Sequence, residues 1–218
     1  MNAQITDGRS AGLRERKKQQ TRQHISNTAT LLFLERGYDS VTIAEIAAAA
    51  DVAKMTVTNY FPRKEDLVLD LHDIFVETLA QTVREREIGE SALAALRRNY
   101  LATVAERNAV VGFSGPDFAR LITSSSALVA RLREFHEERE RRLAACLAAE
   151  TSAGPDEFAP RVAAALLGGI HRALFEETLR RTVAGESNDV IAGALTGNVI
   201  TAFDTLEPSL GDYAVRAK

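Results

Sequence analysis

Residues 42–64 read TIAEIAAAADVAKMTVTNYFPRK, and they contain the most informative local pattern in the chain. Thr42 and Glu45 have the S/T-x-x-E spacing of a capping box, which predicts a helix that starts at Thr42. Apolar residues repeat at helical spacing over about 43–50, and a polar segment over about 53–60 then begins a second helix. The stretch therefore predicts a helix-turn-helix, in which an apolar first helix supports a polar second one.

The composition favours an all-helical globular protein. The chain has 218 residues, of which 45% are hydrophobic and 26% charged, and alanine is abundant while strand-type alternation is missing. Its single cysteine, Cys146, cannot form an internal disulfide. The N-terminus has no apolar signal region, and no run of about 18 apolar residues is present to span a membrane. We expect a cytoplasmic protein that does not associate with membranes.

The net charge of −3 argues against a nucleic-acid binder, but the charge is unevenly distributed. Lys and Arg are in excess over residues 1–66, whereas the remainder of the chain is acidic. A locally basic N-terminal part suits attraction to phosphates, and an acidic remainder limits indiscriminate binding to DNA. The basic part is also the part that contains the helix-turn-helix.

The order of helices predicts two domains behind a short arm. Residues 1–13 lack periodicity and are expected to be a disordered arm. Residues 14–66 are expected to form a three-helix domain with the helix-turn-helix, and residues 67–210 a helical bundle that dimerises. Pro62 is placed to open a fourth helix that leads into this bundle.

The C-terminal end of the bundle predicts a dimer. Residues 162–170 are apolar on every side of a helix, so this helix must be buried all round, and small residues allow a partner to approach closely. The expected interface lies within about 157–206, and the alternative is a central helix of a monomeric core. The predicted interface residues are Ala164, Leu167, Gly168, Leu174, Ile191, Leu195 and Phe203.

The helix-turn-helix resembles the TetR family of bacterial transcription regulators. The family motif reads T-x-x-x-I-A-x-x-A-G-V-S-x-x-T-[LV]-Y-x-[YH]-F-x-x-K-x-x-L, and the resemblance covers about residues 14–70. It implies a homodimeric DNA-binding regulator, by family habit a repressor, that leaves a palindromic operator when a small apolar or amphipathic effector binds. The matching residues are Thr42, Ile46, Ala47, Ala50, Val52, Thr56, Val57, Tyr60, Phe61, Lys64 and Leu67.

Three positions depart from the family motif. Asp51 occupies the usual glycine position, where aspartate enters the left-handed region at some cost. Ala53 replaces the serine that caps the second helix, so that helix is expected to start less sharply. Thr58 replaces a frequent tyrosine, which leaves a smaller reading surface, so the operator sequence does not transfer from relatives.

The resemblance also implies how DNA contacts are divided. The phosphate contacts are expected from Thr42, Thr56, Tyr60 and Lys64, with Lys18 and its basic neighbours Arg16 and Lys17 as additional ligands. The base contacts are expected from Lys54, Met55, Thr58 and Asn59. Lysine favours guanine, asparagine favours adenine, and a threonine methyl suits thymine. The alternatives are that Thr42 only caps its helix, that Tyr60 only packs, and that the basic arm is merely solvated.

A second site, an effector pocket, is expected inside the bundle, because bundle cores are frequent ligand sites. The alternative is that these side chains simply fill a core, and that the histidines are structural. The run of charges from Glu137 to Arg142 is expected to be a solvated face. The predicted pocket residues are Phe75, Leu79, Tyr100, Val104, Phe118, Ile122, Leu132, Phe135, His136, His171 and Phe175.

The two rival functions for such a chain are a helical enzyme and a metal-sensing regulator. No histidine follows Glu in the Glu-x-x-His pattern of di-iron bundles, and neither H-E-x-x-H nor a phosphate-binding glycine loop occurs. The possible metal ligands are scattered without metal-binding spacing, so neither a metal nor a cofactor is expected. These residues are His24, His72, His136, His171 and Cys146.

Overall fold

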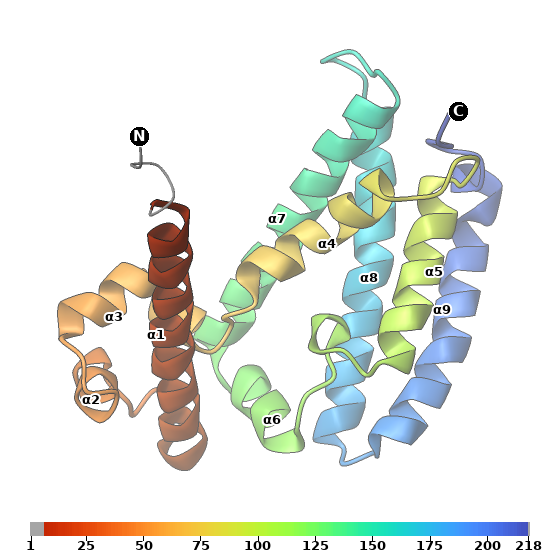
Figure 1. Cartoon of the computed structure of the whole chain (residues 1–218). Coiled ribbons are helices and arrows are strands. Elements are labelled where there is room, and N and C mark those ends of the chain that lie inside the picture. Colours follow the sequence, from red (N-terminus) through yellow and green to blue (C-terminus); the bar gives the residue numbers. More distant parts are fainter. Residues whose placement is uncertain (1–6, 218) are drawn as a thin grey trace, which may run out of the picture. The chain divides into compact units, whose positions relative to one another are not determined.

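The computed structural model describes residues 7–217, with side chains from Arg14 onward. All regular secondary structure in this range is helical, which confirms the all-α fold class. The chain divides between Asp70 and Leu71 into two compact units. Figure 1 shows the N-terminal unit in red to orange and the C-terminal unit in yellow to blue.

The N-terminal unit contains three α-helices and one 3-10 helix. They are α1 (Asp7–Arg36), α2 (Ile43–Ala49), α3 (Lys54–Tyr60) and η1 (Lys64–Leu67). Helix α1 thus begins inside the segment that was expected to be a disordered arm, while residues 1–6 lie outside the described residues. No proline occurs between residues 7 and 36 to interrupt the backbone hydrogen bonds of this helix.

A small apolar core holds the N-terminal unit together. Arg22 also contributes to packing, because its guanidinium lies 4.4 Å from the ring centroid of Phe61. Each helix contributes its apolar face to this core, which orients α2 and α3 against α1. The buried side chains of this core include Ile25, Phe33, Tyr38, Ile46, Val57, Phe61 and Leu67.

The predicted fourth helix does not open at Pro62. The chain forms only the short η1 there, and α4 begins at His72. The single hydrogen of the Ser26 hydroxyl is shared between two acceptors, the carboxylate of Asp70 at 2.7 Å and the carbonyl of Leu67 at 3.1 Å. A continuous helix needs that carbonyl for the amide four residues on, so the contact from α1 favours the interruption.

The C-terminal unit is a bundle of six α-helices with one 3-10 helix among the described residues. Helix α4 packs on α7, α7 on α8, α8 on α9, and α9 on α5. This order brings helices from both ends of the bundle sequence side by side (Figure 1). The elements are α4 (His72–Arg84), α5 (Ala92–Ala105), η2 (Ala109–Val111), α6 (Pro116–Ser124), α7 (Ser126–Glu150), α8 (Ala159–Val183) and α9 (Asn188–Leu210).

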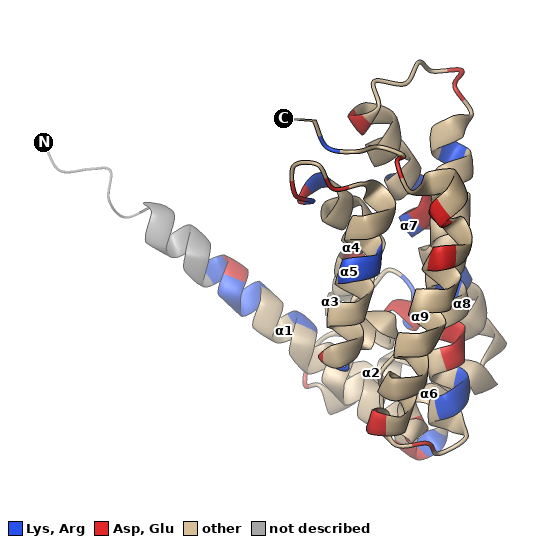
Figure 2. Cartoon of the chain, turned by 90° about the vertical axis from the view of Figure 1, so that its right-hand side faces the viewer, with Lys and Arg blue, Asp and Glu red and all other residues tan. Residues whose placement is uncertain are grey.

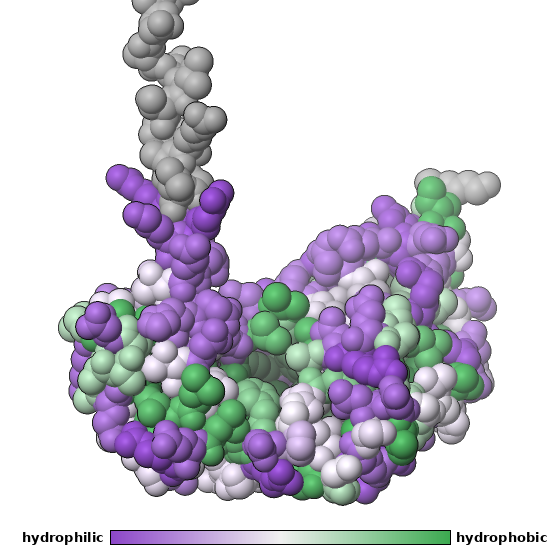
Figure 3. Space-filling model, turned by 60° about the horizontal axis from the view of Figure 1, so that its bottom comes forward, coloured by the Kyte–Doolittle hydropathy of each residue, from purple (hydrophilic) through white to green (hydrophobic). Residues whose placement is uncertain are grey.

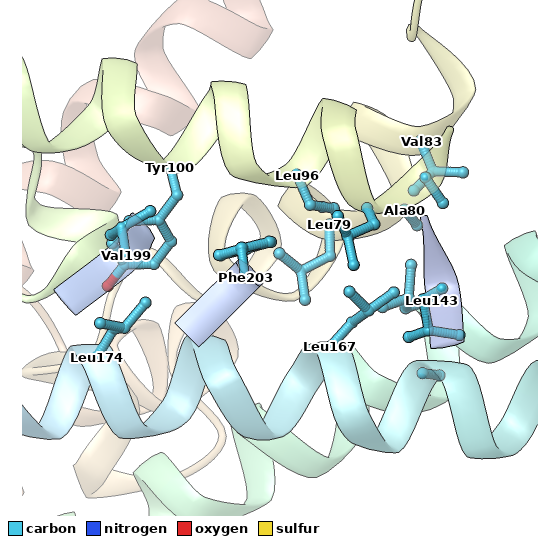
Figure 4. Close-up of a cluster of buried hydrophobic side chains, with 14 of the residues drawn as sticks. Leu79, Ala80, Val83, Leu96, Tyr100, Leu143, Leu167, Leu174, Val199 and Phe203 are labelled. Atoms are coloured by element: carbon cyan, nitrogen blue, oxygen red, sulfur yellow. The ribbon is translucent and has the colours of Figure 1, made fainter. Parts of the chain in front are cut away.

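The core of this bundle receives large side chains from five helices. Figure 4 shows side chains from α4, α5, α7, α8 and α9 pointing into one interior. Burial of this apolar surface is the main stabilising contribution to such a unit. The labelled members include Leu79, Leu96, Tyr100, Leu143, Leu167, Leu174, Val199 and Phe203.

Candidate DNA-binding surface and ligand pocket

Helix α2 starts with the capping box that its sequence predicts. The hydroxyl of Thr42 accepts the amide of Glu45 over 3.3 Å, and the Glu45 carboxylate accepts the amide of Thr42 over 2.8 Å. These hydrogen bonds from Thr42 lower the pKa of Glu45, and Arg36 adds an ion pair of 3.0 Å. The box satisfies two amides that a helix start otherwise leaves without partners. Thr42 remains exposed, and its predicted contact with phosphate stays a prediction.

The turn between α2 and α3 has the two irregularities expected from the sequence. Asp51 adopts a left-handed conformation with φ of 52°. The N-cap of α3 is Ala53, and no side chain caps the amides that follow it. The turn is held instead by backbone bonds, such as that of 3.0 Å from the amide of Val52 to the carbonyl of Ala47. The beginning of α3 therefore lacks the side-chain cap that the beginning of α2 has.

One side of α3 is packed and the other faces solvent. Val57 is fully buried, whereas all four residues predicted to contact bases are exposed, Met55 by 69%. The hydroxyl of Thr58 donates to the carbonyl of Met55 over 3.1 Å. Because that hydrogen is used within the helix, Thr58 offers its methyl group and an acceptor oxygen to solvent. The exposed set is Lys54, Met55, Thr58 and Asn59.

The residues predicted to contact phosphate lie on four elements of the N-terminal unit. Thr42 precedes α2, the half-buried Thr56 and Tyr60 are on α3, Lys64 begins η1, and Lys18 is exposed on α1. Lys18 ends the charged run 14–18, and Figure 2 shows basic residues, in blue, along α1. Phosphate contacts need no shared helix, since a DNA backbone passes several elements of such a domain.

Lys64 has a structural contact that sequence reasoning missed. Its ammonium donates to the carbonyl of Tyr38 over 2.6 Å and lies 4.2 Å from the centroid of the Tyr38 ring. Partial burial lowers the pKa of Lys64, and the Tyr38 hydroxyl donates to Glu65 over 2.8 Å. Lys64 thus ties η1 to the loop before α2. One of three ammonium donors is used in this bond, so a phosphate contact remains compatible with it.

The C-terminal unit contains two cavities that receive part of the predicted pocket. A cavity of about 700 Å³ lies among α6, α7 and α8 and is lined by Ile122, Leu132 and His136, among others. A cavity of about 10 Å³ is lined by residues that include Leu79, Tyr100 and His171. Neither cavity is lined by Phe75, Val104, Phe118, Phe135 or Phe175.

Three of those remaining residues form an aromatic cluster around His136. The Phe75 ring meets the rings of His136 and Phe175 edge-on at centroid distances of 5.0 and 5.7 Å, and lies 6.3 Å from that of Phe135. Phe118 is half-buried and Val104 is buried in the core. Edge-on aromatic contacts of this kind stabilise a packed core. Through their contacts with His136, Phe75 and Phe175 pack behind the wall of the larger cavity.

Arg139 is the functional candidate that sequence reasoning missed. The charge run from Glu137 to Arg142 was expected to face solvent, and for Arg139 this is wrong, since it is only 3% exposed. Arg139 follows Leu132 and Phe135 on the buried stripe of α7, at helical spacing, and this is the signal that marks it in the sequence. Its guanidinium lies 4.2 Å from the Phe75 ring centroid, and its Nη2 donates to Nδ1 of His136 over 3.3 Å.

The histidines beside Arg139 are neutral. Burial, together with the nearby Arg139 and Arg172, lowers the pKa of His136 to about 3. Burial also lowers the pKa of His171 well below its usual value, and raises the pKa of Tyr100. At neutral pH Arg139 is therefore the charged member of this buried group. Within residues 14–217 no group of three or more His, Cys, Asp or Glu side chains is placed to hold a metal ion.

The residues predicted for the dimer interface lie in the interior of the single chain, and the interface itself stays a prediction. All seven are buried inside a single chain, and Figure 4 shows Leu167 and Leu174 of α8 and Phe203 of α9 pointing into the core. A helix that is apolar all round does not reveal in its sequence which face turns inward. The seven are Ala164, Leu167, Gly168, Leu174, Ile191, Leu195 and Phe203.

Other apolar residues of α8 and α9 reach the surface. Val162 and Leu166 on α8 and Val190 and Ile200 on α9 are 39–56% exposed. Helix α9 carries three acidic residues and no basic one, so its surface in Figure 2 is mostly uncharged. Apolar surface patches, green in Figure 3, mark interaction sites when they are contiguous. No helix of the described part of the chain has the length and apolarity that crossing a bilayer requires.

Known proteins match both the motif and the whole chain. Residues 25–71 match the family model of bacterial regulatory proteins, tetR family. The chain is 30% identical over 205 residues to the HTH-type transcriptional regulator TcmR of Streptomyces glaucescens, covering 91% of this chain and 88% of that protein. It is 33% identical over 87 residues to the HTH-type transcriptional repressor DhaR of Mycobacterium sp. strain GP1, covering 39% and 43%.

The fold also matches solved structures of regulators. The structure of SmeT in complex with triclosan superposes with a TM-score of 0.55 and 16% identity, over 89% of this chain and 93% of that one. This similarity concerns the fold, while the match to TcmR extends along nearly the whole sequence. The chain belongs to the TetR family of bacterial transcription regulators.

Proposed function

We propose that this DNA-binding regulator is a homodimeric repressor that leaves a palindromic operator when a small apolar or amphipathic ligand binds. The observation that carries the proposal is the division of α3 into a buried face at Val57 and an exposed polar face. An exposed polar helix on a packed support has the form of a recognition helix in the major groove. Because it acts on DNA in a bacterial cell, we place it in the cytoplasm.

The exposed apolar residues of α8 and α9 support the homodimer. The two helices pack on one another, and Val162, Leu166, Val190 and Ile200 expose side chains to solvent. A two-fold axis would join the same surface of two copies and bury this apolar area. Two copies also supply two recognition helices, which read half-sites about 34–36 Å apart on DNA. The operator is then an inverted repeat.

Repression fits a protein that occupies promoter DNA and excludes RNA polymerase. The relative DhaR bears the name of a transcriptional repressor. Ligand release is supported by the cavity of about 700 Å³ in the bundle, whose volume is that of a site for a small molecule. SmeT, which shares the fold, has been solved with triclosan. A ligand acts on DNA binding to the extent that it favours a conformation whose recognition helices no longer match the operator.

Selection of bound sequences from a random DNA library tests the function. We expect the full chain to enrich an inverted repeat and to protect two half-sites about one helical turn, or a multiple of it, apart. The purified operator then serves in a mobility-shift assay with a panel of apolar and amphipathic small molecules. Enrichment of single, unrepeated sites would contradict the dimeric operator, and a panel without effect on operator affinity would contradict ligand release.

A further inference from the structure

The most unusual charge in the C-terminal unit is that of Arg139. It is 3% exposed, and among the described residues no carboxylate pairs with it. Burial lowers the pKa of Arg139 to about 10, which still leaves the guanidinium charged at neutral pH. A buried charge without a counter-ion is costly, and proteins rarely keep one unless it has a function.

The group that Arg139 contacts also lacks hydrogen-bond partners. Arginine can only donate, so Nδ1 of His136 is the acceptor in their bond of 3.3 Å. In a neutral imidazole the hydrogen then resides on Nε2, and this buried donor has no partner in the described chain. Nε2 of His171 and the hydroxyl of Tyr100 are likewise buried without partners. Buried polar atoms in proteins nearly always have hydrogen-bond partners, so three unpartnered ones in one group indicate a partner from outside the chain.

Each of the two cavities is lined by one member of the hydrogen-bonded pair His136 and Arg139. His136 lines the cavity of about 700 Å³, while Arg139, Tyr100 and His171 line the cavity of about 10 Å³, which has room for about one water molecule. The wall of the larger cavity includes Arg133 and Arg172, and neither of them pairs with a carboxylate in the part of the chain that the structure describes. The remaining wall is apolar except for Thr123, Glu176 and Arg180, and Arg180 pairs with Glu177.

We propose that the ligand of this pocket is an amphipathic anion, whose acidic group binds His136 beside the guanidinium charge of Arg139 and whose apolar body fills the larger cavity. The inference rests on the proposed ligand response and names its chemical class. An anion supplies the missing counter-charge, and its several acceptor oxygens also suit the unpartnered donors of the cluster. The apolar wall residues Ile122, Leu132 and Leu179 then contact the body of the ligand.

A matched pair of fluorescent probes tests the charge preference. 8-Anilinonaphthalene-1-sulfonate and N-phenyl-1-naphthylamine differ only in the sulfonate, and both brighten in apolar sites. We expect the wild-type protein to bind the anionic probe at least about tenfold more tightly. Arg139→Met should remove this difference, lowering affinity for the anionic probe at least about tenfold and leaving the neutral probe within about threefold.

Arg141→Met is the matched control, since Arg141 is exposed two residues further on the same helix. It should change neither affinity by more than about threefold. Equal affinity of wild type for the two probes, no binding of the anionic probe, or an effect of Arg139→Met that Arg141→Met reproduces would each overturn the proposal. An equal loss of affinity for both probes in Arg139→Met would overturn the proposal as well.

Two further measurements keep the test valid if Arg139→Met alters folding. Loss of an uncompensated charge should raise the Tm of the ligand-free protein by at least about 2 °C, whereas a structural arginine would lower it. If the Tm falls, the variant His136→Phe is the second test, because it keeps a packed aromatic ring and removes the hydrogen-bond donor. It should lower affinity for the anionic probe alone, by at least about threefold. Unchanged affinity of His136→Phe for the anionic probe would overturn the proposed site.

The probe measurements use no DNA, so they separate this inference from the proposed function. Release of the operator by charged and neutral ligands alike would reject the anion preference and leave ligand response standing. Binding of the anionic probe through Arg139 without any change in operator affinity would support the site and reject ligand-driven release.

Discussion

Asn59 and Lys64 show how the two kinds of DNA contact differ at the scale of single residues. Asn59 is exposed on α3, where an amide can bind adenine, and Lys64 already holds the carbonyl of Tyr38. The sequence pattern predicts both residues, but it gives no sign that Lys64 also stabilises the domain. The reason is that its contact partner lies on a loop 26 residues away.

The first prediction concerns these two side chains. Lys64→Ala should weaken binding to all sequences and reduce the slope of log affinity against log salt by about 1, whereas Asn59→Ala should change base preference at one operator position. Titrations at several salt concentrations and a library selection measure the two effects. Because Lys64 also binds Tyr38, thermal denaturation is the control for folding. A uniform loss of affinity in Asn59→Ala would reject its role in base reading.

The second prediction concerns His136 and the dependence of the unfolding free energy on pH. Its pKa in the folded state is lowered to about 3, so the stability that the neutral imidazole contributes is present above the unfolded pKa and is lost as pH falls. Between about pH 7 and about pH 5 wild type should lose about 2 kcal/mol of unfolding free energy that His136→Phe does not lose. Urea denaturation at the two pH values measures it. The same loss in both proteins would contradict the burial of a neutral histidine.

At the scale of elements, the two helices of the motif differ in how firmly they begin. The capping box of α2 forms as the sequence predicts, because all its partners lie within four residues. Asp51 is left-handed and Ala53 gives no side-chain cap, which confirms that α3 starts with less support. Local chemistry of this kind is readable from sequence, since few distant contacts can override it.

The third prediction follows from the missing cap of α3. Ala53→Ser should stabilise the N-terminal unit by about 0.5–1 kcal/mol, because the serine hydroxyl can accept an otherwise free amide of the first turn. Differential scanning calorimetry measures the change. Ala49→Ser, at the exposed last residue of α2, is the matched control and should give no gain. A destabilised Ala53→Ser protein would show that the first turn of α3 does not accept a cap.

For the whole molecule, membership of the TetR family confirms the predicted DNA-binding regulator and the prediction that the chain is not an enzyme. The proposed dimer remains to be tested in solution. Its surface is made by the exposed side chains of α8 and α9, and none of the seven residues chosen from the sequence lies on it. Operator binding by the proposed dimer then depends on α8 and α9, which lie far along the chain from the recognition helix α3.

The fourth prediction tests this surface. Leu166→Glu places two like charges near a two-fold axis in apolar surroundings, so the chain should sediment as a monomer and bind operator at least about tenfold more weakly. Sedimentation velocity and mobility shifts measure both effects. Ile88→Glu is the control, because Ile88 is another exposed apolar residue of the same unit, outside α8 and α9. A Leu166→Glu protein that remains dimeric would place the interface elsewhere.

Neighbours within a few residues fix the capped helix-turn-helix, the left-handed turn residue and the all-helical class, so these features can be predicted from the amino-acid sequence. Long-range packing instead sets which face of α8 turns inward and buries Arg139 beside His136. An apolar helix without a polar stripe fits a core in several rotations, and the packing of α4, α7 and α9 selects one. Arg139 likewise cannot be told apart from its charged neighbours until the orientation of α7 about its own axis is known.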